Sequence, residues 1–228
     1  MTATTPAWQL VRTTTLTAIA GMADAVGYIT MGGVFAANMT GNTVLAGIAV
    51  AARQHTDASH HFLPLIAFFL GSMLSRVLSR LLATPIAALL LEAALLVGVG
   101  FLPIAAESAV LIVAVAMGLQ SSASGPFCGN AVSTVVVTST LTRTADAIVD
   151  RIWPARKSEP PVIAGLRTLF FAWAGYGLGA IVGALIIPFT PYPLLLPAGL
   201  LLLVILVRPR HPKDIDDKSD SPESPART

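Results

Sequence analysis

Long apolar segments, separated by short polar ones, run along almost the whole chain. Runs near 20 residues are the length that a helix needs to cross roughly 30 Å of hydrocarbon, and the alternating ten-residue segments of outer-membrane barrels are absent. The pattern therefore predicts an all-α fold, a polytopic membrane helix bundle. The apolar blocks extend over about 13–52, 62–82, 85–102, 109–141, 163–187 and 194–207.

The composition agrees with a membrane protein. Of the 228 residues 54% are hydrophobic and 11% are charged, whereas a soluble domain carries roughly 25% charged residues. We expect residues 1–208 to form a single membrane domain. Residues 209–228 mix Lys, Asp, Ser and Pro without periodicity, which is typical of a disordered tail, and we place this tail in the cytoplasm.

Two blocks, 13–52 and 109–141, are longer than one span and have polar centres. The first contains Asn-Met-Thr-Gly-Asn-Thr at 38–43, and the second contains Val-Thr-Ser-Thr-Leu-Thr at 137–142. Glycines near the first centre, as at Gly32, weaken a helix by about 1 kcal/mol each relative to Ala. Polar, Gly-interrupted sequence at matching places of two halves indicates a transporter-type site at the middle of a bilayer.

The positions of Lys and Arg predict the orientation of the loops. Basic residues cluster at 143–167, at Arg76 and Arg80, and after residue 207, so we place these regions in the cytoplasm. Each long block then joins an inside region to an outside loop, so its chain must cross the membrane an odd number of times. This parity predicts six net crossings with both termini inside, although two full spans for the first block remain open. The loops without Lys or Arg, which we place outside, are 54–61, 103–108 and 188–193.

Three net crossings in each half give the halves opposite orientations, which is an inverted repeat. The pseudo-repeats cover about 13–102 and 109–207, and Gly21 and Gly118 open the two polar centres. Small residues at every fourth position make a flat stripe that another helix can approach closely, either inside the chain or in a homo-oligomer. Such stripes follow each polar centre, at Gly71, Ser75 and Ser79 and at Gly175, Gly179 and Gly183.

Asp24 is the only carboxylate of the first block. An ionisable group at membrane depth costs on the order of 3 kcal/mol or more, so it needs a partner. The sequence offers Arg76 on the following helix, or the side-chain amides of Asn38 and Asn42. Asp24 is then either a carboxylate that couples transport to a proton or cation and contacts substrate, or one half of a structural pair with Arg76.

The predicted binding site lies at the bilayer midplane, between the two broken segments. A helix that restarts near Thr43 would aim its positive end at the site, and Pro126 is expected to kink or end the helix of the second half. In the alternative interpretation these polar side chains only cap and join helices, as they commonly do in membranes. The candidate residues are Asp24, Asn38, Thr40, Gly41, Asn42, Thr43, Gln120, Ser122, Thr138 and Thr140.

Catalytic chemistry finds no support in the sequence. All four histidines are expected in loops or in the tail, so no Ser/His pair forms at membrane depth, and hydrolase, zincin and P-loop motifs are absent. We predict no enzyme activity, no cofactor and no metal, because a solvated loop at 55–61 is favoured over a weak metal site. The single cysteine excludes an internal disulfide, and nucleic-acid binding is disfavoured.

The polar centres resemble those of a known family. The motifs are Gly-Met-Ala-Asp-Ala at 21–25, Gly-Val-Phe-Ala-Ala-Asn-Met-Thr-Gly-Asn-Thr-Val at 33–44 and Gly-Leu-Gln at 118–120, followed by Val-Thr-Ser-Thr-Leu-Thr. They are similar to the YoaK-like family of bacterial multi-pass inner-membrane proteins, which carry domain of unknown function 1275. The resemblance covers about 13–207. Ser139 stands where the family usually has a glycine, and Ser121 where it often has Asn. The resemblance implies a bacterial membrane protein of this size and names no substrate.

Together these patterns predict a small secondary transporter or permease for an unidentified small molecule or ion, with the lipid bilayer as its other partner. One alternative is a non-transporting membrane scaffold or subunit whose polar breaks serve helix packing. A channel is the other, and it would need the breaks to meet in a continuous water-filled path.

Overall fold

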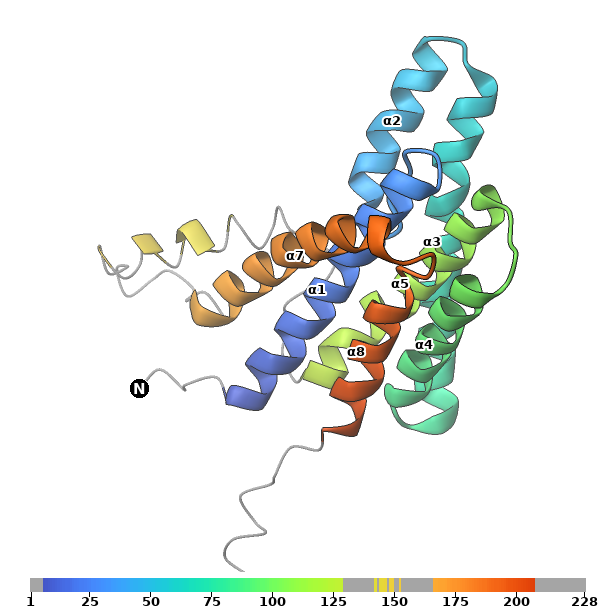
Figure 1. The fold of residues 1–228 in the computed structure, drawn as a ribbon. Helices are drawn as coiled ribbons and strands as arrows, with labels where there is room; N and C mark the ends of the chain where they lie inside the picture. The colour runs from blue at the N-terminus through green and yellow to red at the C-terminus, as the bar shows by residue number, and fades with distance from the viewer. Residues whose placement is uncertain are drawn as a thin grey trace, which may run out of the picture.

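The computed structural model describes residues 6–128, 142, 144–146, 148–149, 152 and 166–207. The predicted counterpart of the first break and the predicted tail lie outside these residues. Helices and no strands make up the described part, which confirms the all-helical class (Figure 1). The elements are α1 Ala7–Thr30, α2 Met39–Ala51, α3 His55–Leu82, α4 Ile86–Phe101, α5 Ala106–Cys128, α7 Leu166–Ile186, the 3-10 helix η1 Ile187–Phe189 and α8 Leu195–Leu206.

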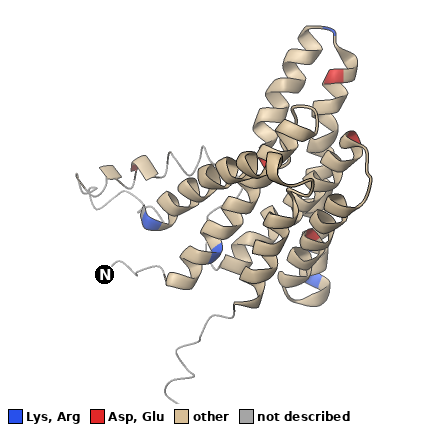
Figure 2. Ribbon diagram, viewed as in Figure 1, with Lys and Arg blue, Asp and Glu red and all other residues tan. Residues whose placement is uncertain are grey.

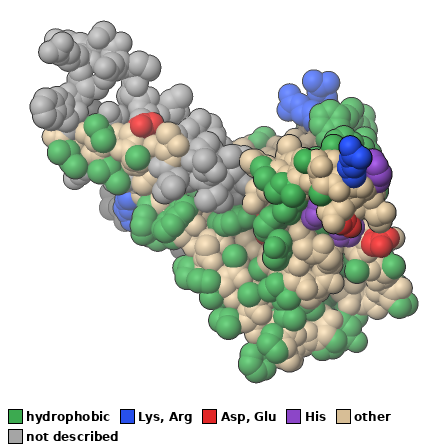
Figure 3. Space-filling model, turned by 90° about the horizontal axis from the view of Figure 1, so that it is seen from above, with side chains coloured by type: hydrophobic (Ala, Val, Ile, Leu, Met, Phe, Trp, Pro, Cys, Tyr) green, Lys and Arg blue, Asp and Glu red, His purple; other side chains and the backbone are tan. Residues whose placement is uncertain are grey.

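Three of the described helical segments are long and apolar enough to cross a membrane: His55–Leu82, Ala106–Cys128 and Arg167–Phe189. Large apolar side chains such as Phe69 and Leu178 are exposed on them. Figure 3 shows apolar side chains spread widely over the face seen from above, with few charged side chains and with the histidines gathered at one side. An exposed apolar surface of this extent fits a helical protein that lies in lipid.

The first long block is broken where its glycines stand. After α1 ends, Gly32 and Gly33 adopt φ of +81° and +75°, a left-handed conformation that glycine adopts at little cost. Asn38 then caps α2, because its Oδ1 accepts a hydrogen bond from the Gly41 backbone N–H at 3.1 Å. The predicted break is confirmed. The new helix begins at Met39 instead of near Thr43, because Asn is among the strongest N-cap residues.

One local prediction is wrong. Residues 55–61 do not form a loop, because α3 begins at His55 and rises with α2 as a hairpin above the bundle (Figure 1). Asp57 in the first turn favours this earlier start, since a carboxylate stabilises a helix N-terminus. Pro126 is exposed within the last described turn of α5, and the residues after Cys128, where its predicted effect would be seen, lie outside the described residues.

α1 lies along α7 with their backbones in direct contact. A Cβ added at Gly21 would overlap the carbonyl oxygen of Tyr176 and lie 2.9 Å from the Ala180 nitrogen. A Cβ added at Gly179 would overlap the carbonyl oxygen of Ala18. The predicted small-residue stripe of α7 is therefore confirmed, and it packs inside the chain.

α5 lies along α3 in the same way. A Cβ added at Gly118 would overlap the carbonyl oxygen of Phe68 and lie 2.9 Å from the Ser72 nitrogen, and one at Gly71 would overlap the carbonyl oxygen of Val115. Ser72 Oγ also donates a hydrogen bond to the Gly118 carbonyl at 3.1 Å. The two glycine contacts of this pair repeat those that Gly21 and Gly179 make between α1 and α7.

Constant offsets relate the two helix pairs. Gly118 follows Gly21 by 97 residues, as Val115 follows Ala18; on the partner helices, Tyr176 follows Phe68 by 108 residues, as Gly179 follows Gly71. The two helices of each pair run in the same direction, whereas α1 and α5 run in opposite directions (Figure 1). The two pairs thus share the register of their glycine contacts.

Arg12 fastens one end of the bundle. Its guanidinium donates hydrogen bonds to the carbonyl oxygens of Phe127, at 2.9 Å, and Val207, at 3.3 Å. It also lies 4.0 Å from the centroid of the Phe127 ring. Because carbonyls at helix C-termini lack partners within the helix, this one cation joins the start of α1 to the ends of α5 and α8.

Candidate functional site

Asp24 occupies the centre of the first break. The side chain is 3% exposed, and its Oδ1 accepts hydrogen bonds from the backbone N–H groups of Ala37, at 2.6 Å, and Asn38, at 3.1 Å. Its Oδ2 accepts the hydroxyl hydrogen of Tyr176 on α7. One carboxylate therefore joins α1, the unwound segment that leads into α2, and a helix from the other end of the sequence.

These partners differ from the predicted ones. Arg76 is exposed on α3, and the side-chain amides of Asn38 and Asn42 bond elsewhere, so neither predicted pairing of Asp24 is correct. The break leaves backbone N–H groups without helical partners, and at membrane depth such groups must be satisfied within the protein. Figure 2 shows that charged residues are few along the described helices and that most lie near helix ends.

Tyr176 is the functional candidate that sequence reasoning missed. Its signal was present, because a tyrosine hydroxyl within an apolar helix needs a hydrogen-bond partner. The residue follows Gly175 directly, beside the small-residue stripe that faces α1. A search for the partner of Asp24 on helices that follow either break would have found it.

Asn42 stabilises the conformation of the unwound segment. It is 0% exposed, its Oδ1 accepts the Phe35 backbone N–H at 2.9 Å, and its Nδ2 donates to the Phe35 carbonyl at 2.7 Å. The same Nδ2 lies 3.9 Å from Met39 Sδ. Asn42 thus replaces both helical hydrogen bonds that Phe35 lacks, which is a structural role.

The remaining predicted residues of the first half lie on the surface of α2 or under an aromatic ring. Thr40 and Thr43 are exposed, and Thr43 Oγ1 donates to the Met39 carbonyl at 2.8 Å. A Cβ at Gly41 would lie 2.8 Å from Cδ2 of Phe35, so that ring covers the glycine. The structure therefore brings Asp24, Asn38 and Asn42 together around the break and leaves the two threonines outside it.

The second half contributes less to this centre. Gln120 is 0% exposed, and its Nε2 donates to the Leu16 carbonyl at 3.0 Å, while its Oε1 has no partner. Leu16 precedes Asp24 by eight residues, which is about 12 Å along a helix. Gln120 therefore joins α5 to α1 at a point that is distant from the carboxylate. Ser122 is half-buried. Thr138 and Thr140 lie outside the described residues.

Glu92 on α4 has an unexpected environment. The side chain is 0% exposed and neither carboxyl oxygen has a hydrogen-bond partner. It lies on the face of α4 that carries the buried Leu89 and Leu96. Glu92 is therefore inside the bundle, away from lipid.

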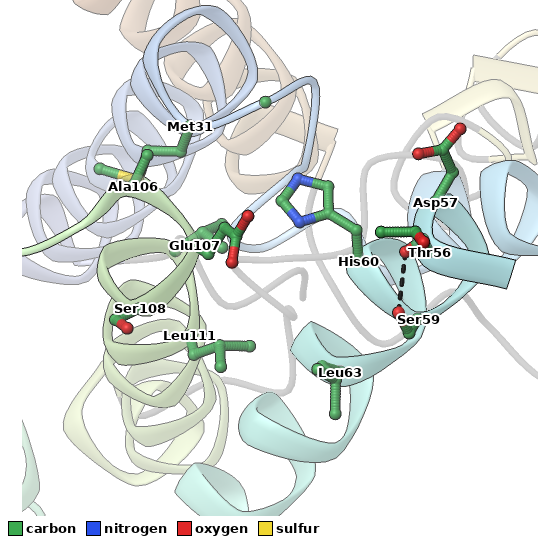
Figure 4. A pocket seen from close by; sticks show the side chains of 12 residues that line it. Met31, Thr56, Asp57, Ser59, His60, Leu63, Ala106, Glu107, Ser108 and Leu111 are labelled. Carbon is green, nitrogen blue, oxygen red and sulfur yellow. Dashed lines mark hydrogen bonds between the residues drawn. The ribbon is translucent and has the colours of Figure 1, made fainter.

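Two hollows open near the break. One, of about 500 Å³, lies between the residues after α1 and the first turns of α3 and α5 (Figure 4). The other, of about 350 Å³, is also lined by Met31 and lies against η1 and the start of α8. None of the predicted site residues lines either hollow. Within the described ranges, His, Cys, Asp and Glu form no group of three that would hold a metal ion.

Comparisons with known proteins agree with a membrane protein. The chain is 27% identical over 182 residues to the UPF0700 transmembrane protein YoaK of Bacillus subtilis (strain 168), an alignment that spans 74% of this chain and 80% of that protein. No solved structure matches. A family described as "Protein of unknown function (DUF1275)" matches residues 13–207. The chain is therefore a transmembrane protein that belongs to the DUF1275 family.

Proposed function

We propose that the protein is a small secondary transporter or permease of the bacterial inner membrane, with its solute site at the broken first crossing around Asp24. The main support is the buried Asp24 carboxylate, which accepts hydrogen bonds from the unwound segment and from Tyr176 on α7. The proposal includes no catalytic chemistry, cofactor or nucleic-acid partner. Its partners are the bilayer and the solute.

The geometry suggests how Asp24 couples binding to movement. A hydrogen bond to a charged group contributes about 1.5–3 kcal/mol, so the Ala37, Asn38 and Tyr176 donors hold the break and α7 in one arrangement. A proton or a cationic group that binds to the Asp24 carboxylate weakens all of these hydrogen bonds at once. Differential binding of this kind is what shifts a protein between two conformations.

The proposal includes six net crossings in two inverted halves. Along the chain α1, α3, α4, α5, α7 and α8 alternate in direction, with α2 continuing the course of α1 (Figure 1). The constant offsets of 97 and 108 residues between the helix pairs support a repeat. With the basic residues 143–167 in the cytoplasm, both termini lie inside. Inverted repeats around a midplane site are typical of secondary transporters.

In the proposed repeat, the first helix of each half packs against a helix of the other half. α1 opens the first half and packs on α7 of the second, while α5 opens the second half and packs on α3 of the first. Each pair therefore joins the two halves. Each pair contains one helix from each half, so a movement of one pair relative to the other moves helices of both halves. Asp24 lies inside the α1–α7 pair.

A non-transporting scaffold or subunit is the second candidate. It is favoured by Asn38, Asn42 and Thr43, whose side chains all bond to backbone groups of the break and α2. A channel has less support, since the two hollows open at one end of the bundle only. Transport ranks first because an ionisable side chain is costly inside a membrane bundle, whereas a scaffold could join the same helices with a neutral side chain.

A thermal-shift screen of the purified protein against small metabolites and ions tests the proposal. Every compound that raises the melting temperature is measured again with Asp24→Asn and with Asp146→Asn, a matched control at an exposed carboxylate. We expect Asp24→Asn to lose the shift and Asp146→Asn to keep it. Proteoliposomes loaded with the compound then report its exchange. Equal binding by the wild type and Asp24→Asn would remove the site assignment.

A further inference from the structure

The larger hollow has the size and walls of a small-molecule site. Its volume of about 500 Å³ falls in the range of about 300–1,000 Å³ that ligand pockets occupy. Three segments build it: the residues that follow α1, the first turns of α3, and the first turns of α5 (Figure 4). Its lining is Met31, Gly32, Thr56, Asp57, Ser59, His60, Leu63, Ala106, Glu107, Ser108, Val110 and Leu111.

The charge of this lining is negative. Asp57 and Glu107 contribute two carboxylates, and neither Lys nor Arg is among the lining residues. The N-termini of α3 and α5 also face the hollow, and each carries roughly half a positive charge. Two negative charges against about one positive charge leave a net charge near −1, which attracts a cation.

The polar groups of the hollow are arranged to accept hydrogen bonds. Glu107 and the His60 ring point toward one another across the opening (Figure 4). Ser59 Oγ donates its hydrogen to the Thr56 carbonyl at 2.8 Å, so its oxygen remains available as an acceptor. Leu63 and Leu111 supply an apolar wall beside these acceptors. A donor-rich cationic head with a short apolar tail fits this combination.

We propose that the hollow binds a small organic ammonium compound, with its N–H donors on Glu107 and His60 and its hydrocarbon part against Leu63 and Leu111. The assignment rests on the proposed function, because it makes the hollow the outer entry site for the transported solute. Organic ammonium is favoured over a bare metal ion, since the described residues form no group of three metal-ligating side chains.

The hollow is physically continuous with the break that Asp24 holds. Gly32 lines it with φ +81°, and a Cβ added there would lie 2.6 Å from His60 Nε2, so the imidazole rests against the unwound chain. The other end of that chain donates the Ala37 and Asn38 N–H groups to Asp24. A ligand that bonds to His60 and shifts its ring therefore acts on the segment that the carboxylate fixes.

The test uses the full-length protein in lipid nanodiscs, with empty nanodiscs as the blank. Calorimetric titration compares n-butylammonium with two probes of similar chain length, uncharged n-butanol and anionic butyrate. We expect only the ammonium to bind, and we expect Glu107→Gln to weaken it about tenfold or more, because a hydrogen bond to a charged group is lost. Asp57→Asn is a second variant at the rim, and Asp146→Asn is the control with unchanged affinity.

Undetectable n-butylammonium binding, tighter butyrate binding, or equal affinity in the wild type and Glu107→Gln would each overturn the assignment. Asp24→Asn separates this inference from the proposed function. If Glu107→Gln loses ammonium binding while Asp24→Asn leaves every response in the thermal-shift screen unchanged, the hollow stands and the site at Asp24 falls. If Asp24→Asn abolishes those responses and Glu107→Gln changes nothing, the hollow alone falls.

Discussion

The α1–α7 pair and the α5–α3 pair have the same backbone packing and different chemistry. Gly21 meets the Tyr176 carbonyl in one pair, and Gly118 meets the Phe68 carbonyl in the other. Three residues after the first glycine stands Asp24, bonded to the Tyr176 hydroxyl. Three residues after the second stands Ser121, opposite a phenylalanine that has no hydroxyl.

The difference separates what builds the bundle from what acts in it. Close contact between helices requires small residues at matched positions, and both pairs retain them. A buried carboxylate is costly in a membrane, and only one pair contains it. Two pairs with the same close packing therefore differ in that one of them contains a buried carboxylate.

The largest effect should come from removing that polar connection. Asp24→Ala leaves the Ala37, Asn38 and Tyr176 donors without partners, at about 1–3 kcal/mol each, so we expect a loss of about 3 kcal/mol or more. The equivalent Ser121→Ala should change stability by no more than about 0.5 kcal/mol. Melting temperatures of the purified variants measure both, at about 2–4 °C per kcal/mol. Similar losses in the two variants would contradict the asymmetry.

The shared framework predicts equal effects at the two glycines. Gly21→Ala and Gly118→Ala each place a methyl group against a backbone carbonyl of the neighbouring helix, and overpacking of this kind costs about 1–3 kcal/mol. Gly177→Ala is the control, because no atom lies within 4 Å of its added Cβ. Thermal melting should rank the control at or above wild type. A clear difference between Gly21→Ala and Gly118→Ala would break the equivalence of the pairs.

A smaller change removes only the hydroxyl. Tyr176→Phe makes the first pair resemble the second, and we expect a loss of about 1.5 kcal/mol, because Asp24 keeps its two backbone donors. The reverse substitution, Phe68→Tyr, should not stabilise the protein, since Ser121 offers no carboxylate. Chemical unfolding in mild detergent compares the two. A gain in stability for Phe68→Tyr would show that the second pair also accepts a polar connection.

The smallest effect is expected at Thr40. Its side chain is exposed on α2, so Thr40→Val should alter stability by no more than about 0.5 kcal/mol. The variant sharpens the comparison, because it tests whether the chemistry of the first pair extends from Asp24 to the surface of α2. Melting with and without a compound from the screen answers this. A lost response at unchanged stability would extend the site to that surface.

The sequence predicted the helical class, the break in the first block and the close packing of the α7 stripe, because each depends on local pattern. Gly32 and Gly33 stand where left-handed backbone occurs, and Gly179 stands where two backbones touch. Length and hydropathy define helices in the same local way. These features need no knowledge of which helices become neighbours.

The partners of Asp24 depend on that knowledge and were predicted wrongly. Proximity in sequence favoured Arg76, whereas the hydroxyl comes from Tyr176, 152 residues away. Opposite charge also misled the choice, because backbone N–H groups freed by the break lie closer to the carboxylate. The helical start of α3 at His55 was missed because a polar segment beside an apolar run has no hydrophobic periodicity.

The packing of α1 on α7 sets an order for assembly during synthesis. A ribosome that adds about 5–20 residues per second needs about 8–30 s to pass from Asp24 to Tyr176, since 152 residues separate them. Through that interval the nascent α1 has Gly21 uncovered and its carboxylate without the tyrosine. The close contact of α1 with α7 can therefore form only after most of the chain has been synthesised.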